Sequence, residues 1–489
     1  MGMKQNFRIP KGIRIEIIDD LKGSLFVDPD FIYTNNEEIS WKRPFELVEA
    51  GQKPELFVGE VCKKDVLQGN LGDCWFLSAC AAISHHSMFM NKVLPPNQSL
   101  YGENYSGLLH FRFWRFGTWK DVVIDDLLPV KYGKLHYARC LEENEFWLPL
   151  LEKAYAKIHD GQYANIEGGF SKDALVDLTG GISEKYSVKE MEEANLFKYL
   201  LRAYKSDAFV TCSAKKGETD TENVGLLANH TYTVTQVEIV RDNQKNKIRL
   251  FRIRNPWGNG KEWTGSWSDS SIAWQTLSHR TREILGQRKE EDGEFWMSLP
   301  DFISYFTEVT ICTLGPDFNA DGSADLNRKY DYISGKWIKG KSAGGCINNM
   351  DTFCINPQFC LTIFEDSTDA EDEIEDGELE RGTSFCHYSV LIALMQIDDS
   401  QKGRPVENRK KIGFCLYKVD EPKRLDKEYL LYNRDIGDSG DFTNWREVCA
   451  RFTLETGNYI IIPSTFHQNQ EASFLIRVFS QKIFKLTAL

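Results

Sequence analysis

The sequence predicts an α+β chain in which a helix-rich segment is followed by two β-rich ones. Helix signals gather between residues 41 and 180, where an apolar, Ala-rich run covers residues 75–84. Runs rich in β-branched residues dominate residues 182–316, and regular short strands separated by polar turns fill residues 327–484. We therefore expect two unlike lobes followed by a separate antiparallel β-sandwich.

We expect the chain to divide into five parts. These are an N-terminal lead-in (residues 1–43), a helical lobe (44–181), a β-rich lobe (182–316), a linker (317–328) and a β-sandwich domain (329–489). The lead-in is polar, and residues 147–159 predict a second helix for the first lobe. The expected strands cover residues 108–124 in the first lobe, 208–213, 230–240 and 248–254 in the second, and 359–364, 389–397, 411–419, 458–462 and 473–479 in the sandwich.

Composition and charge argue against several classes of protein. Asp and Glu outnumber Lys and Arg by 72 to 59, and the net charge of −13 argues against nucleic-acid binding as the main task. No apolar run approaches the roughly 18 residues of a membrane span, and the N-terminus lacks the apolar core of a signal peptide. The 12 cysteines include no C-x-x-C pair, which argues against a zinc ribbon or a disulfide scaffold. We expect a reduced, cytoplasmic protein.

Cys74 stands where a nucleophilic cysteine is expected. It follows a glycine-punctuated turn, GNLGD (69–73), and precedes the run that is predicted to be a helix. The unpaired backbone N–H groups and the macrodipole of a helix N-terminus favour a thiolate over a thiol. Gln68 could supply a side-chain amide donor to a developing oxyanion. Taken alone, the same pattern also fits a buried structural cysteine.

Two residues farther along supply the partners that a nucleophilic thiol needs. His230 begins a β-rich run, and Asn255 follows another, directly before a Pro-Trp-Gly turn. A thiol needs an imidazole to take its proton, and the imidazole needs a third group to fix its tautomer and ring angle. The order Cys74, His230, Asn255 is that of papain-like thiol proteases. A helical lobe carrying the cysteine and a β-rich lobe carrying the histidine would place the substrate between them.

Three blocks of this sequence resemble the active-site blocks of calpains, which are calcium-dependent cysteine proteases. They are QGNLGDCWFL (68–77), GLL with HTYTVT (225–235) and RNPWG (254–258). Further similar stretches cover residues 111–129, 145–147, 151–158, 173–181 and 292–297. The resemblance runs continuously over residues 25–315 and more loosely to the end. It implies a two-lobed papain-like protease core followed by a C2-like antiparallel β-sandwich, in a calpain without a penta-EF-hand domain in this chain.

The resemblance implies a role for each residue of the site. The Cys74 thiolate attacks a peptide carbonyl, and His230 protonates the leaving amine. Asn255 orients the imidazole through its side-chain carbonyl, and Gln68 forms the oxyanion hole together with the backbone N–H of Cys74. Trp257 shields the pair formed by the histidine and the asparagine.

In calpains each protease lobe also binds one Ca²⁺ ion, and the matching positions here are rich in the oxygen ligands that Ca²⁺ prefers. They are Val58, Glu60, Asp65 and Asp173 for the first lobe, and Glu262, Asp269, Glu290, Asp292 and Glu294 for the second. Val58, Glu60 and Glu290 are expected to bind through their main-chain carbonyls. Two positions depart from the family, because Glu60 stands where a Gly is usual and Asp173 where a longer Glu is usual.

Two further acidic segments bear on calcium. Residues 317–322 begin like an EF-hand loop, but Arg328 occupies the twelfth position, where a bidentate Glu is required, so we interpret the segment as a linker. Residues 365–380 carry ten acidic residues in sixteen, which fits either a solvated loop or an electrostatic sensor of Ca²⁺ and of basic surface. Through this loop or the C2-like domain, the chain could contact its own protease lobes or membrane lipid.

The sequence thus predicts a calcium-regulated cytoplasmic cysteine endopeptidase that performs limited proteolysis of protein substrates. Because no complete EF-hand is found that could support dimerisation, we expect a monomer. One alternative is a catalytically impaired scaffold that binds partners through its β-sandwich; Asn229 and Thr231, where a Gly and an Ala are usual beside His230, keep it open. A transglutaminase would share the Cys–His chemistry but uses an Asp as third member, and Asn255 argues against it.

Overall fold

The chain forms two compact units, Met1–Leu314 (unit 1) and Gly315–Leu489 (unit 2). The computed structural model describes residues 24–33, 38–59, 65–84, 86–103, 105–214, 222–258, 262–290, 292–315, 329–365, 388–397, 409–480 and 482–489. Helices and antiparallel sheets occur together, which confirms the α+β class. The finer division of unit 1 into a lead-in and two lobes stays a prediction. None of the helices within the described residues has the length and apolar character that a membrane crossing requires.

The half of unit 1 that carries Cys74 packs around one central helix. Its elements are β1 (Ser40–Lys42), η1 (Pro44–Glu46), α2 (Cys74–Ile83), α3 (Ser87–Val93), β2 (Leu108–Arg115), β3 (Thr118–Asp125), β4 (Leu128–Lys131), β5 (Lys134–Leu135), α4 (Trp147–Ile158), η3 (Tyr163–Ile166) and α5 (Ser171–Thr179). The two predicted helices are confirmed as α2 and α4, to within one residue. Every residue of α2 after Cys74 is buried, so its Ala-rich sequence makes a core helix rather than an amphipathic surface one.

The other half of unit 1 is a six-stranded antiparallel sheet in the order β10-β9-β8-β7-β11-β6. Its elements are β6 (Ile182–Ser187), α6 (Glu193–Lys205), β7 (Phe209–Ala214), η4 (Glu222–Val224), β8 (His230–Arg241), β9 (Lys247–Arg254), η5 (Ile272–Thr276), α7 (His279–Ile284), β10 (Glu294–Ser298), α8 (Leu299–Tyr305) and β11 (Glu308–Thr313). Because β8 and β9 are antiparallel neighbours, the first residue of β8 and the residue after β9 lie at the same end of the sheet. These two residues are His230 and Asn255.

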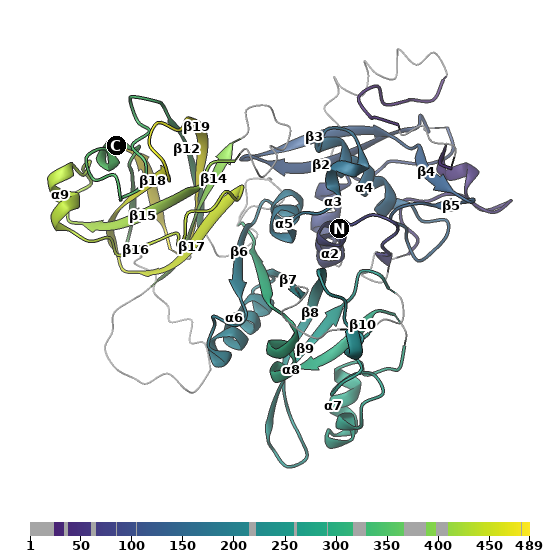
Figure 1. Ribbon diagram of the computed structural model, residues 1–489. Helices are drawn as coiled ribbons and strands as arrows, with labels where there is room; N and C mark the ends of the chain where they lie inside the picture. The colour runs from purple at the N-terminus through teal and green to yellow at the C-terminus, as the bar shows by residue number, and fades with distance from the viewer. Residues whose placement is uncertain are drawn as a thin grey trace, which may run out of the picture. The chain divides into compact units, whose positions relative to one another are not determined.

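Helix α2 lies directly against this sheet, as Figure 1 shows for its contact with β8. The hydroxyl of Thr233 on β8 donates a buried hydrogen bond of 2.8 Å to the carbonyl of Ser78 on α2. A buried hydrogen bond between side chain and helix backbone fixes how far the helix sits from the strand. The helix that begins at Cys74 and the strand that begins at His230 are therefore held together within unit 1.

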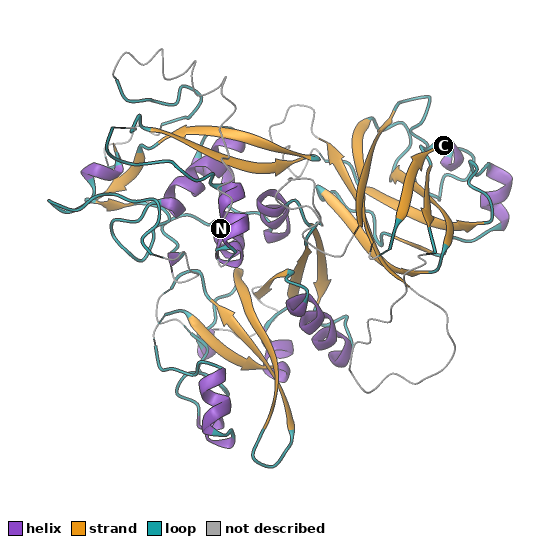
Figure 2. Ribbon diagram, turned by 180° about the vertical axis from the view of Figure 1, so that it is seen from behind, coloured by secondary structure: helices purple, strands orange, loops and turns teal. Residues whose placement is uncertain are grey.

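Unit 2 contains two packed antiparallel sheets, ordered β12-β19-β14-β17 and β16-β15-β18-β13-β20, whose strands are drawn in orange in Figure 2. Its elements are β12 (Lys329–Trp337), η6 (Phe353–Ile355), β13 (Phe359–Ile363), β14 (Tyr388–Ile397), β15 (Ile412–Val419), α9 (Lys427–Tyr432), β16 (Gly437–Asp438), β17 (Glu447–Leu454), β18 (Gly457–Thr465), β19 (Ala472–Ser480) and β20 (Phe484–Ala488). The five predicted strands are confirmed as β13, β14, β15, β18 and β19. Apolar side chains from both sheets form one core, as in a β-sandwich.

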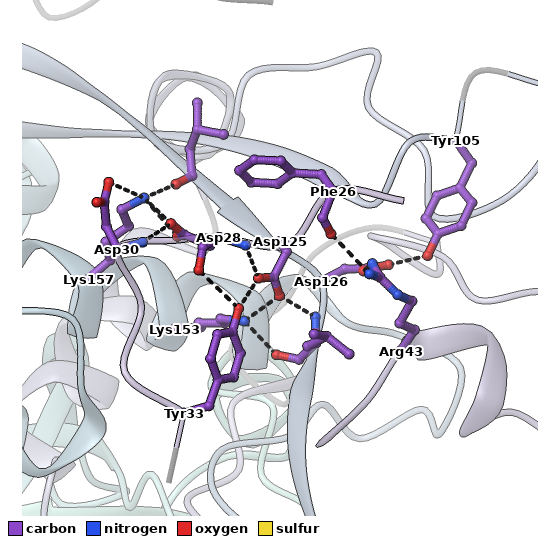
Figure 3. A network of polar contacts seen from close by, with 12 residues as sticks. Phe26, Asp28, Asp30, Tyr33, Arg43, Tyr105, Asp125, Asp126, Lys153 and Lys157 are labelled. Carbon is purple, nitrogen blue, oxygen red and sulfur yellow. Dashed lines mark hydrogen bonds and ion pairs between the residues drawn. The ribbon is translucent and has the colours of Figure 1, made fainter. Parts of the chain in front are cut away.

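The described residues of the predicted lead-in, 24–33 and 38–43, pack against the rest of unit 1. Strand β1 pairs with β4, and a buried polar network holds the segment before it (Figure 3). The carboxylate of Asp28 accepts two hydrogen bonds of 2.7 and 2.8 Å from Lys157 Nζ, and its backbone N–H donates to Asp125. The Tyr33 hydroxyl also donates to Asp125. The predicted strand character of residues 13–18 lies outside the described residues.

The centre of that network is an ion pair between Lys153 on α4 and Asp125 at the end of β3. Their atoms Nζ and Oδ1 are 2.6 Å apart, and neither side chain has measurable exposure. The ammonium of Lys153 also lies over the rings of Phe31, Tyr33 and Trp41. Leaving one partner of a buried pair without the other typically costs about 3–5 kcal/mol. The N-terminal segment therefore contributes to the folded state of the Cys-bearing half.

Candidate active site

Cys74 is the first residue of α2 and is half-buried. The turn before it needs its first glycine, because a Cβ at Gly69 would lie 2.0 Å from the carbonyl oxygen of Tyr137. The same turn is anchored by a hydrogen bond of 3.1 Å from the Asn70 backbone N–H to the carbonyl of His136. The backbone N–H of Cys74 has no partner within α2, because it belongs to the first turn. The structure thus places a thiol and an available N–H donor side by side.

The electrostatic environment favours a neutral thiol, which differs from the expectation of a thiolate. Burial raises the pKa of the Cys74 thiol, and the charge of Asp73 raises it further. Hydrogen bonds from the backbone and side chain of Thr231 act in the opposite direction but do not outweigh burial. The helix N-terminus alone was the basis of the expectation, and desolvation in a folded interior is the larger effect here.

His230 and Asn255 form the pair that the sequence predicted. His230 Nε2 lies 2.8 Å from Asn255 Oδ1, and both side chains are buried. Asn255 is held in turn, because its N–H donates to Gly293 O at 2.8 Å and its Oδ1 also accepts from the Trp257 N–H at 3.0 Å. Burial lowers the pKa of His230 to about 4, although the hydrogen bond to Asn255 raises it. The neutral imidazole donates from Nε2 to an amide carbonyl, which leaves the Nδ1 lone pair as the base.

The backbone beside His230 explains one departure in the sequence, the Asn at position 229. The φ angle of Asn229 is +54°, in the left-handed region that favours Gly and that Asn tolerates better than other residues. Its N–H donates to Ala214 O at 2.7 Å, which continues the sheet into the turn. The ring of Trp257 contacts the His230 ring edge-on, with centroids 5.4 Å apart. Asn229 therefore preserves the backbone conformation of the usual Gly, and Trp257 covers the imidazole as expected.

Gln68 connects the two halves of the site. Its backbone N–H donates to Pro256 O at 3.1 Å, which ties the cysteine turn to the asparagine turn. Its side-chain Nε2 donates to Leu71 O at 2.7 Å, within its own turn. The amide that was expected to face an oxyanion is therefore used internally in this structure. Because Nε2 carries two N–H groups, the bond to Leu71 O uses one of them and leaves the second as the donor for an oxyanion.

For the first predicted calcium set, the structure places Val58 and Asp65 beside a carboxylate that sequence reasoning missed. Glu145 Oε1 accepts a hydrogen bond of 3.0 Å from the Val58 N–H. Burial raises the pKa of Glu145 to about 7, and the nearby charge of Asp65 adds to the shift. Asp173 lies in the first turn of α5, where its N–H donates to Phe170 O. Glu60 lies outside the described residues.

The only signal for Glu145 in the sequence was its place in the stretch 145–147, which resembles calpains. That resemblance assigned no role to the residue. A buried carboxyl group whose pKa is raised by burial and by a neighbouring carboxylate, as for Glu145 beside Asp65, is expected at a cation site without its cation. Val58, Asp65 and Glu145 therefore fit a hard oxygen-binding cation in their chemistry. We treat Glu145 as a further candidate ligand beside Asp173.

For the second set, three acidic residues lie close together in the loops before β10. Asp269 Oδ2 accepts from the Glu290 N–H at 3.1 Å. Burial raises the pKa of Asp269, and the charges of Asp292 and Glu290 raise it further. Glu262 Oε1 accepts from the Gly293 N–H at 2.6 Å, so its carboxylate reaches the same loop. Loop carboxylates crowded in this way suit Ca²⁺.

Glu294 differs from the rest of its set, because its charge is already balanced. It begins β10 and is buried, with Oε2 lying 2.8 Å from Arg252 Nη2 and Oε1 accepting from the Thr235 hydroxyl at 2.8 Å. Within the described part of the chain, no three His, Cys, Asp or Glu side chains are gathered in a metal-binding arrangement. Both sets thus offer the right kind of ligand, while their side chains are turned to local hydrogen bonds.

Comparisons with known proteins show which family the chain resembles. The description "Calpain family cysteine protease" matches residues 22–313, and "Calpain large subunit, domain III" matches residues 333–479. Calpain-A of Drosophila melanogaster is 41% identical over 481 residues, which cover 94% of this chain and 56% of that protein. Calpain-9 of Mus musculus is 39% identical (94% and 65% covered), and the calpain-2 catalytic subunit of Homo sapiens 38% (94% and 66%).

The chain thus spans between about half and two thirds of the length of these relatives. The match to the protease description nevertheless covers more than half of this chain and contains every residue of the candidate site. This chain belongs to the calpain family of cysteine proteases.

Proposed function

We propose that the protein is a calcium-regulated cysteine endopeptidase that performs limited proteolysis of cytoplasmic protein substrates through Cys74, His230 and Asn255. The observation that supports it best is the buried hydrogen bond of 2.8 Å between His230 and Asn255. This pair lies at the end of the sheet against which the cysteine helix packs. An imidazole with a fixed tautomer, carried by a strand that packs against the helix of the thiol, is the arrangement from which nucleophilic catalysis by cysteine can proceed.

The residues would act in two half-reactions. Nδ1 of His230 takes the proton of the Cys74 thiol, and the thiolate attacks the peptide carbonyl to form a tetrahedral intermediate. The Cys74 backbone N–H and the second N–H of the Gln68 amide hydrogen-bond the oxyanion. The imidazolium then protonates the leaving amine, and the acyl-enzyme is hydrolysed by a water that gives its proton to the same imidazole. Asn255 keeps the ring oriented throughout.

Calcium regulation is supported by the resting electrostatics. Burial keeps the thiol and the imidazole neutral, so the ion pair needed for attack is disfavoured in this conformation. Ca²⁺, when bound, supplies positive charge at the two acidic sets. The carboxylates of Asp65, Glu145, Asp269 and Asp292 would hold it, and each would exchange a local hydrogen bond or a repulsive contact for a metal bond.

A cavity next to the histidine provides a place for a substrate side chain. It has a volume of about 160 Å³, and Asn229 and Thr231, which flank His230, contribute to its wall. Lys172, Lys185 and Glu308 also line it, so the lining is polar and charged. In the described residues all ten cysteines are free thiols, which fits the proposed cytoplasmic location.

The replacement Asn255→Ala should lower kcat/KM for a peptide substrate about ten- to a thousandfold without abolishing turnover, because the nucleophile and the base remain while the ring loses its orientation. The effect should fall on kcat rather than on KM, because Asn255 is buried and the peptide cannot touch it. Steady-state kinetics of the purified variant beside the wild type measure it. Unchanged kinetics would mean that Asn255 only shapes the turn.

The proposed function is tested by cleavage of casein with the purified chain, in Ca²⁺ and in excess chelator, beside Cys74→Ala. We expect fragments only from the wild type and only with Ca²⁺. Cleavage that persists in chelator would overturn the calcium requirement. A folded wild-type protein that cleaves nothing at any Ca²⁺ concentration would favour the impaired scaffold that binds partners through unit 2.

A further inference from the structure

Two carboxyl groups are buried directly behind the nucleophile. Asp73 precedes Cys74 as the N-cap of α2, and Glu152 lies on α4; their exposed fractions are 0% and 1%. The two side chains are within hydrogen-bonding contact of each other. Lys153 follows Glu152 in the chain, but its ammonium is bound to Asp125 and Leu127 O. No ion pair to Asp73 or Glu152 occurs within the described residues.

The pair has to contain a proton. Glu152 accepts from the Ala138 N–H, at 3.2 Å to each oxygen, and both oxygens of Asp73 are buried without an N–H or hydroxyl donor among the described residues, which leaves the Glu152 carboxyl as their partner. A carboxylate can only accept, so two ionised groups could not bond to each other. Two buried negative charges without a cation would also be strongly unfavourable. A protonated Glu152 that donates to Asp73 satisfies both requirements.

Asp73 also determines where the nucleophile lies. Its backbone carbonyl accepts from the Phe76 and Leu77 N–H groups at 2.8 and 3.1 Å, and these bonds start α2. The side chain is not used as a cap, although Asp is a common capping residue. It turns instead toward Glu152. The charge on the pair is therefore one residue from the thiol, on an element that cannot shift independently of Cys74.

The other titratable groups around the pair carry no positive charge. Cys80 faces it from α2, and Tyr163 faces it from η3 with a buried hydroxyl that has no hydrogen-bond partner in the described residues. Tyr137 faces Glu152 from the loop before α4. A neutral thiol and two neutral phenols do not compensate a carboxylate. The protonation state of the pair thus decides the charge of this part of the interior.

We propose that Asp73 and Glu152 form a proton-sharing positioning pair that controls the nucleophilicity of Cys74: with one proton the pair places a negative charge beside the thiol, and with two it is neutral. This proposal rests on the proposed function only in taking Cys74 as the nucleophile. Burial raises the pKa of Asp73 to about 7 and that of Glu152 well above its usual value. The charge beside the thiol is therefore gained as the pH rises through neutrality, and it then disfavours the thiolate.

The test is the rate at which iodoacetamide alkylates Cys74 in the full chain, followed by mass spectrometry of the Cys74 peptide from acid to alkaline pH. In the wild type we expect two inflections, one from the pair near neutrality and one from the thiol. Asp73→Asn removes the charge, so alkylation at and above neutral pH should be about three- to tenfold faster. Glu152→Gln donates an amide hydrogen bond but no proton, so Asp73 stays charged to lower pH. Alkylation should then be slower below neutrality by a similar factor and unchanged above it.

The opposite signs of the two variants separate this proposal from a role in packing alone. A packing role predicts lower stability in both variants with the wild-type pH profile retained. Asp177→Asn is a matched control, because Asp177 is a buried carboxylate of unit 1 balanced by Arg115 at 2.9 Å, and it should leave the profile unchanged. A single inflection in the wild type, or shifts of the same sign in both variants, would overturn the proposal. If a variant does not fold, the pH profile of the wild type still tests the proposal. Alkylation of Cys74 does not require proteolysis, so a protein without protease activity would contradict the proposed function but not this inference.

Discussion

Cys74→Ser and His230→Ala will each abolish cleavage of casein. A serine hydroxyl at position 74 has a far higher pKa than a thiol, and the neutral, buried His230 cannot remove its proton at a useful rate. Without His230, neither the thiol nor the leaving amine has a proton-transfer partner. Removing one member of a unit that acts together typically costs about as much as removing all of it. We expect no turnover above background, measured by fragment release from purified protein.

The stability of these variants separates a catalytic effect from a folding defect. Cys74→Ser is nearly isosteric at a half-buried position, so the free energy of unfolding should change by less than about 1 kcal/mol. His230→Ala loses a buried hydrogen bond, although Asn255 Oδ1 keeps the Trp257 N–H, and it should cost about 1–3 kcal/mol. Cys80→Ser is the matched control, because Cys80 is a fully buried cysteine of the same helix, and this variant should be less stable yet active. Turnover by purified Cys74→Ser would refute the assignment.

The parts of the site that could be predicted from sequence are those set by local pattern. The Ala-rich run after Cys74 and the strand endings at His230 and Asn255 are short-range signals, and the antiparallel pairing of β8 with β9 then brings the latter two residues together. The structure confirms the hydrogen bond between them. The β-sandwich strands were predictable for the same reason, because each alternates over a few residues between polar turns.

What could not be predicted depends on burial by segments far apart in the chain. The position of Cys74 at a helix N-terminus suggested a thiolate, but burial in the folded unit raises the pKa of the thiol, and hydrogen bonds from Thr231 of β8 do not outweigh it. Asp28 is one of two aspartates in residues 24–33, and no local pattern shows that its charge is balanced by Lys157 of α4, more than a hundred residues farther along the chain. Sequence spacing likewise could not show that Glu145, rather than Asp173, reaches the Val58 backbone.

That last difference leads to the second prediction, which concerns calcium. Asp65→Ala and Asp292→Ala should each raise the Ca²⁺ concentration needed for half-maximal cleavage by about ten- to a thousandfold, because ligand charge sets affinity at oxygen sites. Neither residue takes part in the chemistry, so kcat at saturating Ca²⁺ should be largely recovered. Calorimetric titration of the full chain should show that each variant loses one binding event. The two sites are independent in sequence, and the double variant should be inactive at all practical concentrations.

Glu145→Gln and Asp173→Asn form the matched pair that decides the composition of the first site. Both remove one charge and preserve side-chain size. If Glu145 is the ligand, as its contact with Val58 and its proximity to Asp65 indicate, only Glu145→Gln shifts the calcium titration. If Asp173, the position implied by the resemblance to the family, is the ligand, only Asp173→Asn shifts the calcium titration. Replacing Asp317 and Asp321, which lie outside the described residues, should change nothing, because their loop has Arg328 where the bidentate Glu is needed. The calcium requirement could instead survive in the double variant Asp65→Ala, Asp292→Ala and disappear in the linker variant. That result would mean that the calcium ions that regulate activity do not bind at the two acidic sets of unit 1.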